Sequence, residues 1–212
     1  MFWKIRSPVA VPSARHAGAR GKELSQLPSS SMSAEQAVIW GKLAAFPIDD
    51  PSAEVPLSKR LSKEEEWSHE YALRVVEEYR KFLFLSMVAD HMVTPSLRVD
   101  QAWHCHLLYT RSYWEGLCLR TLGRLIHHEP SKGGEEEEKH FGDLYGRTLD
   151  LYARFFGEPP EDIWGCRHGE HRSPAACRGV TGPAPGEPIP DNERELLSMI
   201  EKAALRLKSK QP

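Results

Sequence analysis

Several features that would point directly to a function are missing from this 212-residue sequence. The most apolar run, from Phe82 to Ala89, covers about eight residues, whereas a helix needs about 20 to cross a bilayer. The first 31 residues lack the continuous apolar stretch of a secretory signal. These absences exclude a protein that spans a membrane and argue against export by a secretory signal, so we expect a cytoplasmic protein.

Strong charge of one sign is also absent. The 28 Lys and Arg residues nearly balance the 30 Asp and Glu residues, which leaves a net charge of −2. Nothing therefore draws the chain as a whole toward nucleic acid or an anionic membrane. There are only four cysteines, with neither a signal nor a disulfide framework. This indicates a reducing compartment, in which Cys105 and Cys118 are small core residues.

Familiar catalytic motifs are missing as well. The sequence contains no His-Glu-x-x-His pair, no paired Cys-x-x-Cys, no nucleophile elbow, no phosphate loop and no dinucleotide fingerprint. Each of these motifs would indicate a reaction class, because each places particular groups in a known local geometry. Without them, any chemistry has to be inferred from clusters of side chains.

Helical periodicity dominates what is present, and the fold class we predict is all-α. We expect one compact bundle of four to five helices at residues 33–165, preceded by a disordered basic arm at residues 1–32. A linker, first rich in Cys and His and then in Pro and Gly, follows at residues 166–190. Residues 191–212 form a C-terminal helix tethered by this linker.

Two capping boxes predict where helices begin. Ser33, with a glutamine three residues later, opens a short helix at about 34–46 that buries Val38 among other apolar residues. Ser62, with a glutamate three residues later, opens the longest helix, at about 63–91. Four successive glutamates from residue 135 favour another helix start, since carboxylates stabilise the first turn.

The segment from Asp100 to Pro130 is the richest in groups that can do chemistry, and holds four of the ten histidines. Ser96 is a helix N-cap, so Asp100 and His104 lie one turn apart on the same helical face. His106 lies roughly 200° around the helix from His104. Both histidines can bind one ion only if the helix loosens after Cys105; otherwise one of them faces elsewhere.

A second helix of this segment is predicted at about 111–122, with Thr110 as its N-cap and Gly123 ending it. The chain then turns back, and an antiparallel helix pair would bring His128 and Glu129 toward Asp100.

Two interpretations of this cluster stay open. Asp100, His104, His106 and His128 form an acceptable ligand set for a divalent metal such as zinc, iron or manganese, with Glu129 or Tyr109 as the catalytic group that moves protons. Alternatively, the same residues form a satisfied hydrogen-bond network in a helical core. Clustered titratable groups point to functional sites only as a tendency, so the residues alone do not decide between the two.

The same segment carries a resemblance. The run 99–114, followed by Cys118, Gly123 and the pair His127 and His128, resembles the glycine-rich-domain-containing-protein-like family. The similarity extends over about residues 36–164, although the chain lacks the glycine-rich tail of the plant members. Because that family is a domain of unknown function, the resemblance implies domain limits and no particular activity.

A second cluster lies further along the chain and consists of Cys166, His168, His171 and Cys177. Two cysteines and two histidines match the stoichiometry of a structural zinc site, but their spacing fits no known finger. In a segment rich in proline and glycine, a mobile tail is the favoured interpretation.

Three functional classes follow. A binding or scaffold protein with a His-rich polar centre is the preferred one, with a protein partner or self-association through the C-terminal helix. A metal-dependent enzyme that activates water or oxygen is the alternative. RNA binding through the basic arms is a weaker alternative, so nucleic acid is not the partner that we expect.

Overall fold

The computed structural model describes residues 32–130, 135–165 and 177–178. The arm at residues 1–31, most of the linker and the C-terminal helix predicted at 191–212 lie outside the described residues. Within them the all-α class is confirmed. The helices are α1 (Ala34–Ala45), α2 (Leu57–Glu64), α3 (His69–Val88), α4 (Leu97–Leu107), the π-helix η1 (Arg111–Leu122), α5 (Glu135–Phe156) and α6 (Glu161–Trp164).

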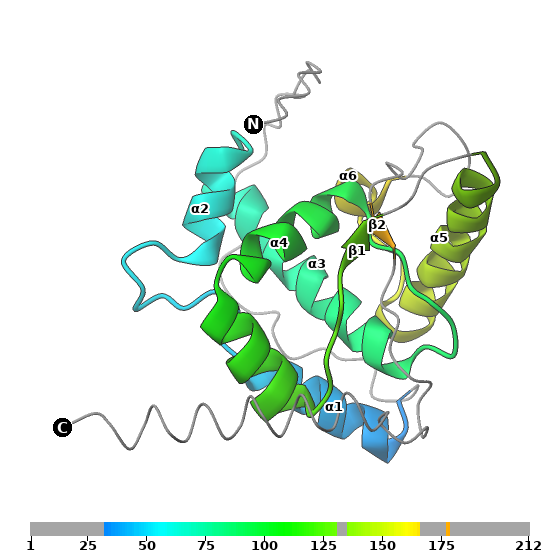
Figure 1. Ribbon diagram of the computed structural model, residues 1–212, viewed down its shortest axis with the longest axis horizontal. Coiled ribbons are helices and arrows are strands. Elements are labelled where there is room, and N and C mark those ends of the chain that lie inside the picture. The colour runs from blue at the N-terminus through cyan, green and yellow to red at the C-terminus, as the bar shows by residue number, and fades with distance from the viewer. Residues whose placement is uncertain (1–31, 131–134, 166–176, 179–212) are drawn as a thin grey trace.

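Helix α3 organises the bundle. It contacts α1, α2, α4 and α5, and α2 and α5 lie on opposite sides of it (Figure 1). Within the apolar run from Phe82 to Ala89, the residues Phe82 to Leu85 of α3 are fully buried, whereas Ser86 and Val88 are partly exposed. Two short strands, β1 (Glu129–Pro130) and β2 (Cys177–Arg178), pair in antiparallel fashion.

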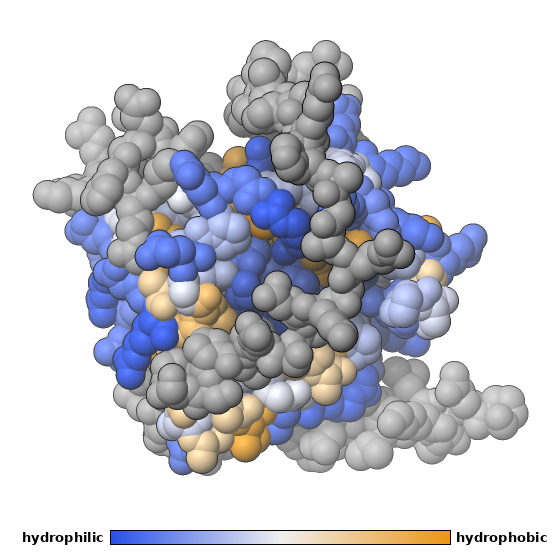
Figure 2. Space-filling model, turned by 180° about the vertical axis from the view of Figure 1, so that it is seen from behind, coloured by the Kyte–Doolittle hydropathy of each residue, from blue (hydrophilic) through white to orange (hydrophobic). Residues whose placement is uncertain are grey.

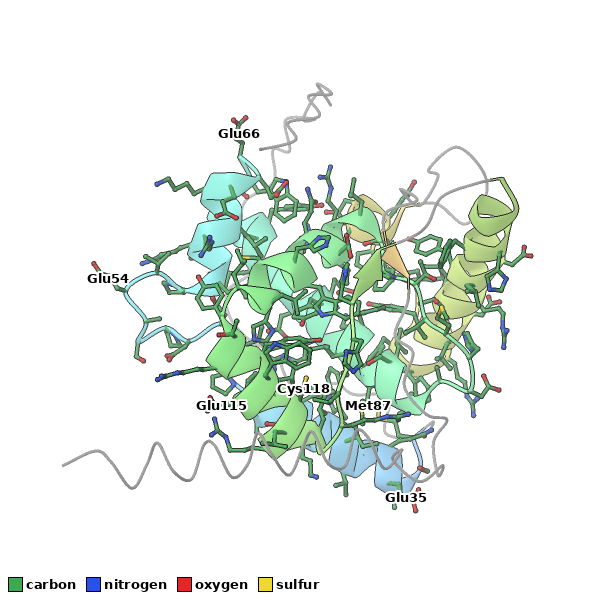
Figure 3. All side chains as sticks on the ribbon, viewed as in Figure 1. Glu35, Glu54, Glu66, Met87, Glu115 and Cys118 are labelled. Carbon is green, nitrogen blue, oxygen red and sulfur yellow. The ribbon has the colours of Figure 1, made fainter. Side chains whose placement is uncertain are left out.

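The predicted long helix at 63–91 is wrong in its first turns. Helix α2 already begins at Leu57, and the chain turns at Glu66, whose φ is 58° and whose side chain points away from the ribbon (Figure 3). The hydroxyl of Ser62 donates to the Trp67 carbonyl at 2.8 Å instead of capping a helix, and Ser68 caps α3. The cause is that Leu57 and Leu61 are buried in the core, which extends α2 upstream and leaves the cap to the later serine.

The capping box at Ser33 is confirmed, but Val38 is not buried: it is 59% exposed. Leu43 is the buried residue of α1, so the helix packs on the core through the face that carries Leu43 and not through the face that carries Val38. Arg80 of α3 fixes this end of α1, because its Nη1 donates to the carbonyl of Phe46 at 2.8 Å and to that of Leu43. A guanidinium at a helix C-terminus satisfies carbonyls that have no partner within the helix.

A buried carboxylate joins three helices. Glu78 of α3 accepts hydrogen bonds from the Tyr152 hydroxyl at 2.7 Å and from Trp164 Nε1 at 2.8 Å, and forms an ion pair with Lys81 at 2.7 Å. Tyr152 belongs to α5 and Trp164 to α6. Both Glu78 oxygens are therefore satisfied, and the network holds α5 and α6 against α3.

Thr110 does not cap η1, contrary to the prediction. Its backbone is helical, with φ −52° and ψ −37°, and its side chain makes no capping bond. The end of α4 tightens instead, since Leu108 N donates to Cys105 O at 3.2 Å and Tyr109 N to His106 O at 2.9 Å. The chain thus passes from α4 into η1 without the extended residue that an N-cap requires. Gly123, with φ 66°, ends η1 as predicted.

No helix among the described residues is both long and apolar enough to cross a membrane. The face seen in Figure 2 is mostly hydrophilic, with apolar residues gathered in separate patches.

Candidate metal centre

Helix α4 carries two of the candidate ligands on one face. Its N-cap is Ser96, whose Oγ accepts from Val99 N at 3.2 Å, as the sequence predicts. One turn further on, His104 Nδ1 lies 3.3 Å from Asp100 Oδ2. The Asp100 side chain is only 7% exposed and that of His104 is 53% exposed. The helix therefore presents a buried carboxylate beside an imidazole that solvent can reach.

The third candidate comes from the non-helical segment after η1. Leu125 and Ile126 are buried and anchor this segment, which returns the chain toward α4. His128 Nε2 lies 2.9 Å from Asp100 Oδ1, and the centroid of its ring is 4.3 Å from that of His104. The His128 side chain is 6% exposed. One ligand atom from each of these three residues lies within 4.8 Å of the others, and we call this group the Asp-His-His triad.

The triad has the dimensions and the donors of a metal site. Two ligands bound at about 2.1 Å and separated by about 90–110° lie roughly 3.0–3.4 Å from each other. The two separations from Asp100, 2.9 Å from Oδ1 to His128 and 3.3 Å from Oδ2 to His104, are close to this range, and one ligand atom from each of the three residues lies within 4.8 Å of the others. Two imidazoles with one carboxylate suit zinc and iron, and three protein ligands leave coordination positions open.

The charge state of His104 suits a ligand. Burial lowers its pKa, and the neighbouring imidazole of His128 lowers it further, while the negative charge of Asp100 acts in the opposite direction. The net direction is downward, so the imidazole is neutral near pH 7. Metal binding requires the neutral form, because its lone pair is the ligand.

His106 is not brought to the triad. Helix α4 continues without loosening to Leu107, so His106 faces the core and is fully buried. Its Nδ1 lies 3.2 Å from the Tyr79 hydroxyl, and its Nε2 lies 3.1 Å from Ser112 Oγ. Burial lowers the pKa of His106 to about 4, so this imidazole stays neutral. A neutral imidazole can accept at one nitrogen and donate at the other, which satisfies both contacts.

Tyr109 and Glu129, the two residues proposed to move protons, lie in different elements. The Tyr109 hydroxyl donates to the Val55 carbonyl at 3.1 Å, and the Arg60 guanidinium lies 5.8 Å from the centre of the Tyr109 ring. These contacts direct Tyr109 toward the segment before α2. Glu129 is the residue after His128 and the first residue of β1, where its backbone pairs with Arg178 of β2.

The cysteines divide between the core and the tail. Cys105 and Cys118 are buried free thiols, and burial raises their pKa values to about 12 and about 11, so neither is a reactive thiolate. Of the tail cluster, Cys166, His168 and His171 lie outside the described residues. Cys177 belongs to β2, in register with Pro130.

Two groups that hold the histidines in place have no signal in the sequence. Tyr79 and Ser112 contact His106 from α3 and η1, at separations of 27 and 6 residues along the chain. The ring of Trp103, the residue before His104, also contacts His128, with ring centroids 4.5 Å apart. Such contacts depend on how helices cross, which residue spacing within one helix does not reveal.

A family model described as UCP032817-like matches residues 49–142, a range that contains the whole triad. This is an uncharacterised family, so the match supports a helical domain without adding an activity, and the glycine-rich family name is not confirmed. No curated protein and no solved structure matches the chain.

Proposed function

We propose that this domain binds one divalent transition-metal ion through Asp100, His104 and His128, and that it is a metal-dependent enzyme. One observation carries the proposal: residues from two separate segments place a carboxylate oxygen and two imidazole nitrogens within 4.8 Å of one another. Two of the three side chains are more than nine-tenths buried, so the group is built into the fold.

The number and exposure of the ligands favour catalysis over a purely structural ion. Structural zinc sites are closed by four protein ligands, whereas catalytic sites keep a position for water or substrate. The triad supplies three ligands, and the half-exposed side chain of His104 leaves it open to solvent. An ion held there would polarise a substrate oxygen and lower the pKa of a bound water. Asp100 would offset part of the positive charge and hold both imidazoles in orientation.

Metal titration of the purified chain tests this proposal. We expect the wild-type protein to take up one Zn²⁺ or Mn²⁺ ion per chain in calorimetry, and His104→Ala to lose this uptake. His140→Ala is the matched control, because His140 is an exposed histidine on α5 that belongs to no ligand group formed by the described residues. Since His104 is also half exposed, its replacement should leave the helical circular dichroism unchanged. Equal uptake by His104→Ala and wild type would overturn the proposal.

Protein binding is the second candidate, and one surface feature favours it. Leu97 and Leu108 are 43% and 61% exposed and share one face of α4 with His104. In an antiparallel pairing of two α4 helices, Leu97 of one copy would meet Leu108 of the other, as the isologous contact of a two-fold dimer requires. We expect Leu108→Asp to shift a dimer to monomer in light scattering after size exclusion. A wild-type chain that is already monomeric at high concentration would contradict this candidate.

A further inference from the structure

One buried hydroxyl connects the two segments that carry the triad. Trp103 Nε1 donates to the Tyr113 hydroxyl at 2.9 Å, and that hydroxyl donates to the Ile126 carbonyl at 2.5 Å. The side chains of Trp103 and Tyr113 are fully buried, and Ile126 is 1% exposed. The Tyr113 hydroxyl thus acts as acceptor and donor at once, the two roles open to a phenol.

Both ends of this connection adjoin candidate ligands. Trp103 immediately precedes His104 on α4, and its ring packs edge-on against His128 at an interplanar angle of 74°. Ile126 lies two residues before His128. Tyr113 itself stands on η1, which is neither of the two segments that carry the triad. Through one oxygen atom, η1 therefore fixes how far α4 lies from the chain that delivers His128.

The segment that carries His128 is held by contacts with other elements: Arg124 N donates to Cys118 O at 3.0 Å near its start, and the paired strand β1 follows His128 directly. Residues 123–128 form no helix or strand, so their position depends on contacts with other elements. Burial of Leu125 and Ile126 resists separation from the core, but apolar burial is non-directional and does not fix position along or around the chain. A hydrogen bond to a carbonyl fixes the position of the segment, because the distance and direction of the bond are restricted.

We propose that Tyr113 is a positioning residue of the metal site, which it sets by holding His128 at binding distance from Asp100 and His104. This inference rests on the proposed metal function. Loss of the hydroxyl would leave the indole N–H of Trp103 and the carbonyl of Ile126 buried without this partner. Both groups would then move toward new partners, because a buried polar group without a hydrogen-bond partner destabilises the folded state. Such movement changes the separation of the ligands even when the fold is kept.

The variants Tyr113→Phe and Tyr79→Phe separate positioning from simple packing. Both tyrosines are fully buried, and each loses only a hydrogen-bonded hydroxyl. Tyr79 contacts His106, which lies outside the triad, so Tyr79→Phe is a control for stability alone. The measurements are Zn²⁺ affinity by calorimetry and the visible absorption spectrum of Co²⁺ bound in the same site. We expect Tyr113→Phe to weaken Zn²⁺ binding about tenfold, the lower end of the effect of residues that orient ligands.

We also expect Tyr113→Phe to change the Co²⁺ spectrum, because that spectrum reports the arrangement of the ligands. Tyr79→Phe should keep both the affinity and the spectrum of the wild type while losing comparable stability. If the wild type binds and both variants match it, the positioning role of Tyr113 is overturned and the metal site stands. A wild-type chain that takes up no ion overturns the metal site, and this inference with it.

A second pair keeps the test decisive if Tyr113→Phe does not fold. Trp103→Phe removes the indole donor and leaves the Tyr113 hydroxyl in place. Its control is Trp40→Phe, since Trp40 packs between Phe84 and Phe156 at ring-centroid distances of 5.6 Å and 5.1 Å. Weaker Zn²⁺ binding in Trp103→Phe alone would support positioning of His128 by Trp103, through its bond to Tyr113 together with its ring contact, and equal binding in both would overturn it.

Discussion

Asp100→Asn should abolish metal binding in the concentration range where the wild-type chain is saturated. Asparagine keeps the shape of the side chain but removes its negative charge and one of the two acceptor oxygens that face His104 and His128. Replacing residues that only orient ligands typically costs 10–100-fold in affinity, so losing a ligand should cost more than about 100-fold. Zn²⁺ calorimetry measures this directly.

Thermal unfolding with and without Zn²⁺ gives an independent reading of the same variant. A ligand that binds only the folded state at 100 times its Kd stabilises it by about 2.7 kcal/mol. For a chain of this size that corresponds to a rise in Tm of roughly 5–10 °C. We expect this rise in the wild type and its absence in Asp100→Asn. If the triad were only a hydrogen-bond network of the core, Asp100→Asn would lower the Tm and Zn²⁺ would change neither protein.

Glu78→Gln should cause a large loss of stability, because the buried carboxylate joins α3 to α5 and α6. Tyr152 and Trp164 both donate to one carboxylate oxygen, and Lys81 donates to the other. An amide keeps one acceptor oxygen, so its NH₂ group meets either the Lys81 ammonium or both the Tyr152 hydroxyl and the indole N–H of Trp164. Hydrogen bonds to charged groups contribute about 1.5–3 kcal/mol each. We therefore expect the free energy of unfolding in urea to fall by about 2–3 kcal/mol.

The neighbouring residue supplies the control for this experiment. Glu77 is half exposed and pairs with Arg80 at 3.1 Å, so Glu77→Gln should change the free energy of unfolding by less than about 1 kcal/mol. Metal uptake should survive both changes, since neither side chain belongs to the triad. Equal stability of the two variants would show that the Glu78 network does not hold the helices together.

Local patterns predicted most of the helices and paired two of the three residues of the triad. Helices begin at the caps Ser33 and Ser96, and a helix ends at Gly123, as expected. Capping depends on residues within one turn, so local sequence reveals it. The pairing of Asp100 with His104 follows from helical spacing alone. The start of α3 was misplaced because Ser62, with a glutamate three residues later, matches a capping box, whereas Ser68 is the serine that caps α3; burial of Leu57 and Leu61 places Ser62 inside α2.

The sequence by itself determined an all-α chain with a carboxylate and an imidazole one turn apart. Only the tertiary structure decided which further histidine joins them. Spacing along α4 separates His104 from His106 by about 200°, but does not say which of them faces the core. The contacts of His106 with Tyr79 and Ser112 are made between different helices. The chain returns to His128 past Tyr113, which holds the non-helical segment through the Ile126 carbonyl. Such contacts depend on the packing of the whole bundle, and no local pattern of residues encodes them.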